Sequence, residues 1–306
     1  MLPLLAAALL APAVASAYDW PVAPFDQQHA IRGAFDDPRV AVGPAGLTET
    51  SFHFGVDIVA PDGTAVYAVA QGTVFRYPDA VAVRQESGHE FSYWHIDPLV
   101  PEHSFAKQGQ LLGYVRAGWG HVHFAESDGR GGYVNPLRPG ALQPFADWTA
   151  PVAGPIALTT PTGAPVRLED VHGRVNLTAD AYDVPPLVPA PPWQNARWTP
   201  ALVSWRLVRG GVDVIPWRVA ADFRTAWLPP YEFNRIFAPG TTQNRPWVAG
   251  RYVFWLAHEL DTATLPNGSY RLEVDAADTR GNTGTTSVAF DVQNAQNTST
   301  TNRSSR

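Results

Sequence analysis

The sequence contains no cysteine, and that absence excludes several kinds of chemistry at once. Without thiols the chain can form no disulfide, no thiolate zinc site and no cysteine-protease nucleophile, so His, Asp or Glu would have to hold any transition metal. Charged residues are also scarce, at 16% of the 306 residues, and Lys and Arg do not cluster. At a net charge of −6 the chain lacks the basic face that phosphates require, and we expect no nucleic-acid partner.

Sustained helical periodicity is missing as well. The 29 prolines and 25 glycines interrupt helices, whereas the 45% hydrophobic fraction is too high for a disordered chain. A length of 306 residues suffices for two domains that each bury a core. The composition therefore favours an all-β protein with two domains.

The first 17 residues form an apolar run that ends in Ala15-Ser16-Ala17. This ending is typical of a signal-peptide cleavage site and would leave Tyr18 as the new N-terminus, although the usual positive charges at the start are missing. The run is short for a stable membrane span. We therefore expect residues 1–17 to be a signal peptide and the protein to be secreted or held in the cell envelope or periplasm.

Residues 18–148 are expected to form the first domain, an antiparallel β domain of short strands separated by Gly, Pro and Asp. Ser87-Gly88 is typical of a hairpin turn between two of these strands. Residues 149–166 are rich in Pro, Thr and Gly, and we expect a linker there that runs into an edge strand. The strands predicted in the first domain span residues 64–70, 73–77, 81–86, 90–95, 111–116 and 122–126.

Residues 167–294 are expected to form the second domain. Strands are predicted at 175–181 and 201–206, while the Pro-rich segment 184–193 cannot be a central strand. Residues 265–293 show two alternating strands after an Asn-Gly turn and resemble the final hairpin of bacterial Ig-like and fibronectin-type domains. That resemblance implies an Ig-like or fibronectin-like β-sandwich, a common accessory module. The polar residues 295–306 are predicted to be a disordered tail.

Four of the nine histidines fall in three short segments of the first domain. His53 and Asp57 stand four residues apart around a glycine and can converge on one cation. His95 follows an aromatic pair. His121 and His123 point to the same face if their segment is a strand, and two histidines on a half-buried face are costly unless something binds them.

Each of these patterns is weak by itself, because surface histidines or a surface loop produce H-x-H and H-x-x-x-D readily. Together, in a β-rich domain without cysteine, they indicate a zinc site of two histidines and one aspartate. A site of that kind with a vacant fourth position is of the catalytic type.

The segment from Arg32 to Pro139 resembles the lysostaphin/LytM-like zinc metallopeptidases of peptidase family M23. The main departures are a longer stretch between Arg39 and His53 and the presence of Trp119 before the last motif, and both concern the shape of the groove. The segments that carry the resemblance are 33–39 (GAFDDPR), 53–58 (HFGVDI), 62–68 with 72–74, 93–95 (YWH), 109–113 (GQLLG), 121–124 (HVHF) and 135–137 (NPL).

This resemblance implies that His53, Asp57 and His123 bind Zn²⁺ and that water or substrate completes the coordination. His95 and His121 would stand nearby without binding the metal, one accepting a proton and the other stabilising the oxyanion. The family usually assigns the base to His121, but the sequence does not divide the two roles. The chain has no complete H-E-x-x-H motif and no G-x-S-x-G nucleophile elbow.

Three further residues are candidates for the substrate groove. Arg39 either contacts substrate or pairs with Asp36 or Asp37, and Trp94 and Trp119 either line the groove or pack in the core. Glu126 is expected to be a solvated carboxylate. Seven of the eleven tryptophans lie in 193–255, where sandwich packing is favoured over a sugar-binding platform.

The resemblance implies an exported zinc endopeptidase that cleaves peptide stems or cross-bridges of peptidoglycan, with Zn²⁺ as cofactor and a peptidoglycan peptide as partner. We expect a monomer. The alternative is a metal-binding but non-hydrolytic module that binds or regulates the cell wall.

Overall fold

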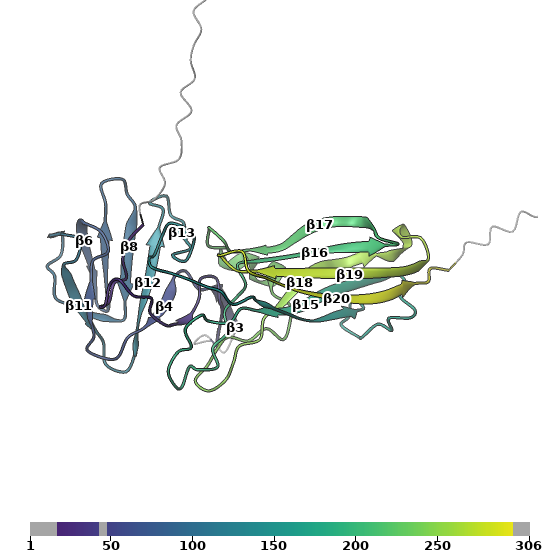
Figure 1. Cartoon of the computed structure of the whole chain (residues 1–306), viewed down its shortest axis with the longest axis horizontal. Helices are drawn as coiled ribbons and strands as arrows, with labels where there is room; N and C mark the ends of the chain where they lie inside the picture. Colours follow the sequence, from purple (N-terminus) through teal and green to yellow (C-terminus); the bar gives the residue numbers. More distant parts are fainter. Residues whose placement is uncertain (1–16, 43–47, 296–306) are drawn as a thin grey trace, which may run out of the picture.

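The computed structural model of the chain describes residues 17–42 and 48–295. The predicted signal peptide and the polar tail lie outside the described residues, apart from Ala17 and Ala295. The described residues form two units of β-structure that lie end to end along the long axis of the molecule (Figure 1). All pairs of named strands are antiparallel, which confirms the predicted all-β class.

An eight-stranded sheet makes up most of the first unit. Its order is β1-β4-β12-β8-β7-β6-β10, and β13 pairs with β12. The sheet contains β1 (Ile31–Gly33), β4 (Val56–Val59), β6 (Gly72–Tyr77), β7 (Ala80–Arg84), β8 (Glu90–Trp94), β10 (Phe105–Ala106), β12 (His121–Ser127) and β13 (Tyr133–Val134).

The strand β12 carries the predicted H-x-H residues and runs between β4 and β8. His123 is the Cα partner of Asp57 on one side and of Trp94 on the other. Val122 and Phe124 are fully buried in the first core, so His121 and His123 lie on the opposite face, as the alternation predicted. The sheet register therefore brings two of the predicted metal ligands side by side.

Two smaller sheets complete the first unit. The strands β5 (Ala65–Tyr67), β11 (Leu111–Val115) and β9 (Ile96–Pro98) form one sheet, and β2 (Pro38–Val42) and β3 (Thr48–Phe52) form a hairpin. Phe52 at the end of this hairpin is buried in the core of the second unit, against Phe223, Phe233 and Phe237. The hairpin thus packs on the second unit, which the sequence did not indicate because its partners lie more than 150 residues further along the chain.

The second unit consists of two sheets over a common core, with strand orders β14-β15-β18 and β17-β16-β19-β20. Leu177 and Phe254 from one sheet and Trp205 and Leu272 from the other are buried together. The Ig-like or fibronectin-like assignment of this unit stays a prediction. The strands are β14 (Val152–Thr159), β15 (Arg174–Tyr182), β16 (Leu202–Arg209), β17 (Val212–Asp222), β18 (Val253–Asp261), β19 (Gly268–Ala277) and β20 (Thr283–Val292).

Helical structure is confined to short pieces in the described residues. The helix α1 spans Phe233–Ile236, and two 3-10 turns span Pro230–Glu232 and Thr262–Thr264. None of the described helices has the length and apolar character needed to cross a bilayer. The Pro-rich segment 184–193 forms no strand. Within the predicted linker and edge strand, 149–166, the structure has the edge strand β14 at Val152–Thr159.

The two units are joined by buried hydrogen bonds. One oxygen of Asp37 accepts hydrogen bonds from the backbone N–H and the hydroxyl of Thr199, at 2.8 and 2.9 Å. The indole N–H of Trp198 donates to the carbonyl of Ile31, the residue before Arg32, at 3.2 Å. These contacts fix β1, an edge of the first sheet, against a loop of the second unit.

Candidate metal centre and its cleft

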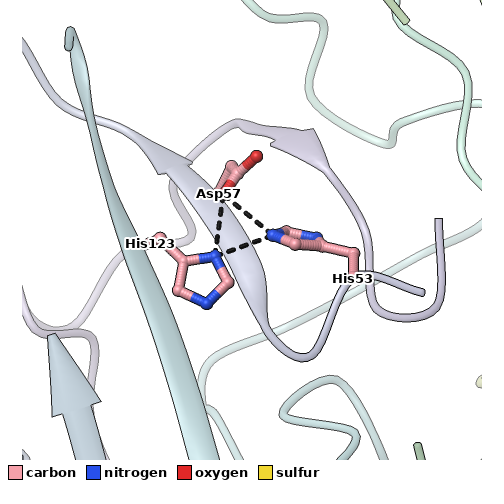
Figure 2. A group of neighbouring side chains, drawn as sticks. All are labelled: His53, Asp57 and His123. Carbon is pink, nitrogen blue, oxygen red and sulfur yellow. Dashed lines mark hydrogen bonds and ion pairs between the residues drawn. The ribbon is translucent and has the colours of Figure 1, made fainter. Parts of the chain in front are cut away.

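Three side chains converge at the end of β4 (Figure 2). Asp57 lies in β4, His123 in β12, and His53 in the segment between β3 and β4. The distance from His53 Nε2 to His123 Nδ1 is 2.7 Å, and Asp57 Oδ1 lies 3.0 Å from the first atom and 3.1 Å from the second. The structure therefore brings together the three residues predicted to bind metal.

A backbone contact sets the tautomer of His53. Its Nδ1–H donates to the carbonyl of Ala34 at 2.7 Å, so Nε2 carries the lone pair that faces His123 and Asp57. His53 is 4% exposed, and burial lowers its pKa to about 3, with the nearby Arg39 charge acting in the same direction. The imidazole is therefore neutral and available as a ligand at neutral pH.

Asp57 is held as a carboxylate. Burial alone would raise its pKa, but the neighbouring His53, His123 and Arg39 hold the pKa well below its usual value. Arg39 Nη2 donates to Asp57 Oδ2 at 3.1 Å, leaving Oδ1 toward the two histidines. Of the two alternatives for Arg39, substrate contact or pairing with Asp36 or Asp37, the second is not observed, because Arg39 pairs with Asp57 and Asp37 is buried under the interface with the second unit.

His121 lies beside this group without belonging to it. Its Nε2 is 3.5 Å from Asp57 Oδ1, and its Nδ1–H donates to the carbonyl of Trp119 at 2.8 Å. The lone pair on Nε2 therefore faces the cleft. Burial, together with the charge of Arg32, lowers the pKa of His121, so the ring is neutral at pH 7.

His95 stands on the other side of His121, with the two ring centroids 4.8 Å apart. It follows β8 in a left-handed backbone conformation with φ of 65°. Its ring stacks on Trp119, and burial lowers its pKa to about 3. Among the described residues, His95 Nδ1 is buried without a hydrogen-bond partner.

The five residues open onto a cleft of about 640 Å³. The three groove candidates, Arg39, Trp94 and Trp119, all line it. Trp193 and Gln243 of the second unit line it as well, and Gln243 Oε1 accepts the backbone N–H of Val40 at 2.7 Å. The cleft is therefore walled by both units.

Glu126 is not a solvated carboxylate, contrary to the sequence-based expectation. It is fully buried and accepts hydrogen bonds from the Tyr18 hydroxyl at 2.5 Å and from His89 at 2.8 Å. Arg138 binds it with two nitrogens, at 2.6 and 2.7 Å. Glu126 thus anchors the described N-terminal residues to β12 rather than orienting a metal ligand.

Part of the first unit matches a known protein family. Residues 51–136 match the model of the family described as Peptidase family M23. The resemblance to peptidase family M23 is thereby confirmed for this segment. The matched segment contains all five histidine and aspartate residues described above: His53, Asp57, His95, His121 and His123.

Individual relatives match only part of this chain. The DD-carboxypeptidase/endopeptidase Mpg of Neisseria meningitidis serogroup B (strain ATCC 13091 / M2091) is 33% identical over 95 residues, 28% of this chain and 22% of the relative. Mpg of Neisseria gonorrhoeae gives the same values. The chain thus spans about a fifth of the length of the curated relatives it matches, 22%.

Solved structures of low overall similarity were also found. A zinc-containing peptidase from Vibrio cholerae has 25% identity and a TM-score of 0.29, covering 36% of each chain. Helicobacter pylori Csd3 has 22% identity and a TM-score of 0.32, covering 43% of this chain and 36% of Csd3.

Two features of the cleft were missed by reasoning from the sequence. Arg32, in β1, lines the cleft beside His121, and Trp193 reaches it from the second unit. Neither residue stands in a motif with functional spacing, so no local pattern could have singled them out. Glu126 was different, because it has the same parity as Val122 and Phe124 along β12 and hence faces the core.

Proposed function

We propose that this protein is a zinc metallopeptidase that hydrolyses peptide bonds in the stems or cross-bridges of peptidoglycan. The observation that carries the proposal is the convergence of His53, Asp57 and His123 in a cleft that also holds two further, non-coordinating histidines. The match of residues 51–136 to peptidase family M23 supports the peptidase activity. The Neisseria relatives are named DD-carboxypeptidase/endopeptidase, which supports peptidoglycan-type substrates.

The donor set fits zinc. Two imidazole nitrogens and one carboxylate oxygen suit this ion, and their separations of 2.7 to 3.1 Å approach the spacing of about 3.3 Å around a tetrahedral zinc. The contact of His53 with Ala34 is the kind of outer hydrogen bond that orients a metal-binding imidazole. When bound, zinc supplies Lewis-acid polarisation and lowers the pKa of water.

In our proposal the two remaining histidines have different roles, one as the base and the other as a hydrogen-bond donor. His121 accepts the proton of the attacking water at Nε2 once that water replaces Arg32 Nη2, which lies 3.2 Å from this atom; the Nδ1–H of His121 is committed to the Trp119 carbonyl. His95, on the far side of His121, donates a hydrogen bond to the oxygen that becomes negatively charged. We further propose export to the cell envelope, which the apolar residues 1–17 support.

The test is digestion of purified peptidoglycan by the zinc-loaded protein, with the products identified by mass spectrometry. New peptide termini are expected with the wild type and should be lost after chelation. Digestion of walls with glycyl bridges and walls with direct D-amino-acid cross-links, run in parallel, would identify the bond. A protein that holds one zinc per chain and binds walls, yet releases no peptide, would support the non-hydrolytic module instead.

A further inference from the structure

Within residues 17–42 and 48–295, Arg32 at the edge of the metal centre is a cation without an anionic partner. Its Nη1 donates to the carbonyl of Trp119 at 3.3 Å, and its Nη2 lies 3.2 Å from His121 Nε2. Among the described residues no carboxylate forms an ion pair with Arg32, whereas its neighbour Arg39 is paired with Asp57. Two of the five N–H donors of the guanidinium thus have protein acceptors, and neither acceptor carries a charge.

The second unit holds this guanidinium in place. Arg32 Cζ lies 4.4 Å from the ring centroid of Trp193, and both residues line the cleft. Burial lowers the pKa of Arg32, which means that the charge has lost part of its hydration. A stacked, partly dehydrated guanidinium with free donors is the arrangement that binds carboxylates through two parallel hydrogen bonds.

We propose that Arg32, supported by Trp193, binds a free carboxylate of the substrate and makes the cleft selective for peptides that carry one near the scissile bond. The position of Arg32 limits how far the bound carboxylate can lie from the scissile bond. Arg32 Nη2 is 3.2 Å from His121 Nε2, and His121 Nε2 is 3.5 Å from Asp57 Oδ1. One extended residue spans about 3.5 Å, so the carboxylate belongs to the residue next to the bond or to the one after it. This inference rests on the proposed function.

The test compares an acylated Lys-D-Ala-D-Ala peptide bearing a free C-terminal carboxylate with the same peptide as its carboxamide. Binding is measured by isothermal titration calorimetry on the full-length, metal-free protein, so that zinc cannot attract the carboxylate itself. The wild type is expected to bind the carboxylate at least about 10-fold more tightly, because a charged hydrogen-bonded pair is lost in the amide. Arg32→Gln should reduce this ratio to about one, and Arg32→Lys should restore part of it.

Matched controls separate this effect from a general loss of charge or fold. Arg218 is an exposed arginine of β17, outside the cleft, so Arg218→Gln should keep the wild-type ratio. Trp193→Ala should lower the ratio and Trp193→Phe should largely restore it, because a ring face is what Arg32 contacts. Trp217→Ala, which removes the ring beneath Arg206, should leave the ratio unchanged.

Equal binding of the two peptides by the wild type, or an undiminished preference in a folded Arg32→Gln protein, would overturn the inference. If walls were nevertheless digested, the proposed peptidase function would stand without it. A carboxylate preference that depends on Arg32 in a protein that cleaves neither walls nor peptides would support the anion site and overturn the proposed function.

Discussion

The indole of Trp119 is stacked on the imidazole of His95, with ring centroids 3.6 Å apart and 8° between the planes. The backbone carbonyl of the same tryptophan accepts the Nδ1–H of His121 at 2.8 Å. One residue thus positions both histidines that lie near the metal group without joining it. Among the described residues His95 Nδ1 forms no hydrogen bond and lies 4.0 Å from Asp79 Oδ2, so the stacking on Trp119 is the closer of these two contacts of the ring.

Replacing Trp119 should therefore slow catalysis without releasing zinc. Trp119→Ala removes the ring and keeps the backbone carbonyl, so His121 retains its tautomer while His95 loses its support. We expect kcat to fall by about 10- to 100-fold, with partial recovery in Trp119→Phe. Zinc content per chain should equal that of the wild type. Trp148→Ala, which removes a tryptophan that is 88% exposed, should change neither quantity.

The two histidines of the H-x-H motif should respond differently to removal. His123→Ala deletes one of three convergent donor atoms and should abolish both zinc retention and hydrolysis. His121→Ala should keep zinc and lose turnover, since Nε2 of His121 lies outside the group. Two measurements distinguish the variants: zinc content by atomic emission after gel filtration, and the rate of product release. Wild-type turnover in His121→Ala would refute its role as base.

The metal group could be predicted from the sequence because its members are set by short-range rules. His121 and His123 share a face through the two-residue period of a strand, and His53 and Asp57 flank a single turn of chain. The same period also places Glu126 on the core face, a consequence that the prediction of a solvated carboxylate did not use. The usual exposure of carboxylates argued the other way, and its buried partners Tyr18 and Arg138 were not evident from local sequence.

The walls of the cleft could not be predicted in this way. Trp193 meets Arg32 from 161 positions further along the chain, and Gln243 meets Val40 from 203. Such contacts depend on how the two units dock, which periodicity and composition do not encode. The same reason explains why the β2–β3 hairpin, expected in the first domain, buries Phe52 in the second core.

The buried cluster around Glu126 should contribute substantially to stability. Glu126→Gln leaves the partly buried Arg138 without its charged partner and should lower the free energy of unfolding by about 3 kcal/mol. Tyr18→Phe removes one hydrogen bond and should cost about 1 kcal/mol. Urea denaturation of the metal-free protein measures both. Glu49→Gln, at an exposed position of β3, serves as control. If Glu126→Gln left the free energy of unfolding unchanged, the stabilising role assigned to Glu126 would be contradicted.

Acid should destabilise the metal-free protein through its buried histidines. The pKa of both His53 and His95 is about 3 in the folded state, below the ordinary value of 6.5 that applies after unfolding. As pH falls from 6.5 toward 3, the unfolded chain takes up these protons first, so stability is lost across this window. His95→Gln should flatten the decline, whereas His103→Gln, at an exposed histidine, should leave its slope unchanged. Denaturation curves at pH 7, 5 and 4 report the slopes.

Alkali should destabilise the protein through a buried carboxyl group at the interface of the two units, that of Asp183. Asp183 is 4% exposed, and burial, reinforced by the charge of Asp147, raises its pKa to about 8. The folded state therefore holds this proton where the unfolded chain, with a pKa near 3.8, has released it. This contribution to stability is complete below pH 3.8 and is lost as pH rises through 8.

Asp183→Asn should remove that dependence on pH. The amide replaces a carboxyl that is mostly protonated at pH 7, and its oxygen can still accept the backbone N–H of Val184, as Asp183 Oδ1 does at 2.8 Å. Between pH 7 and 9 the wild type should lose about 1 kcal/mol that the variant keeps, because stability falls by about 1.4 kcal/mol for each pH unit below the folded-state pKa and the fall levels off once pH exceeds that pKa. Asp26→Asn, at an exposed position, should follow the wild type. Parallel wild-type and Asp183→Asn curves over this range would mean that Asp183 is already ionised in the folded protein.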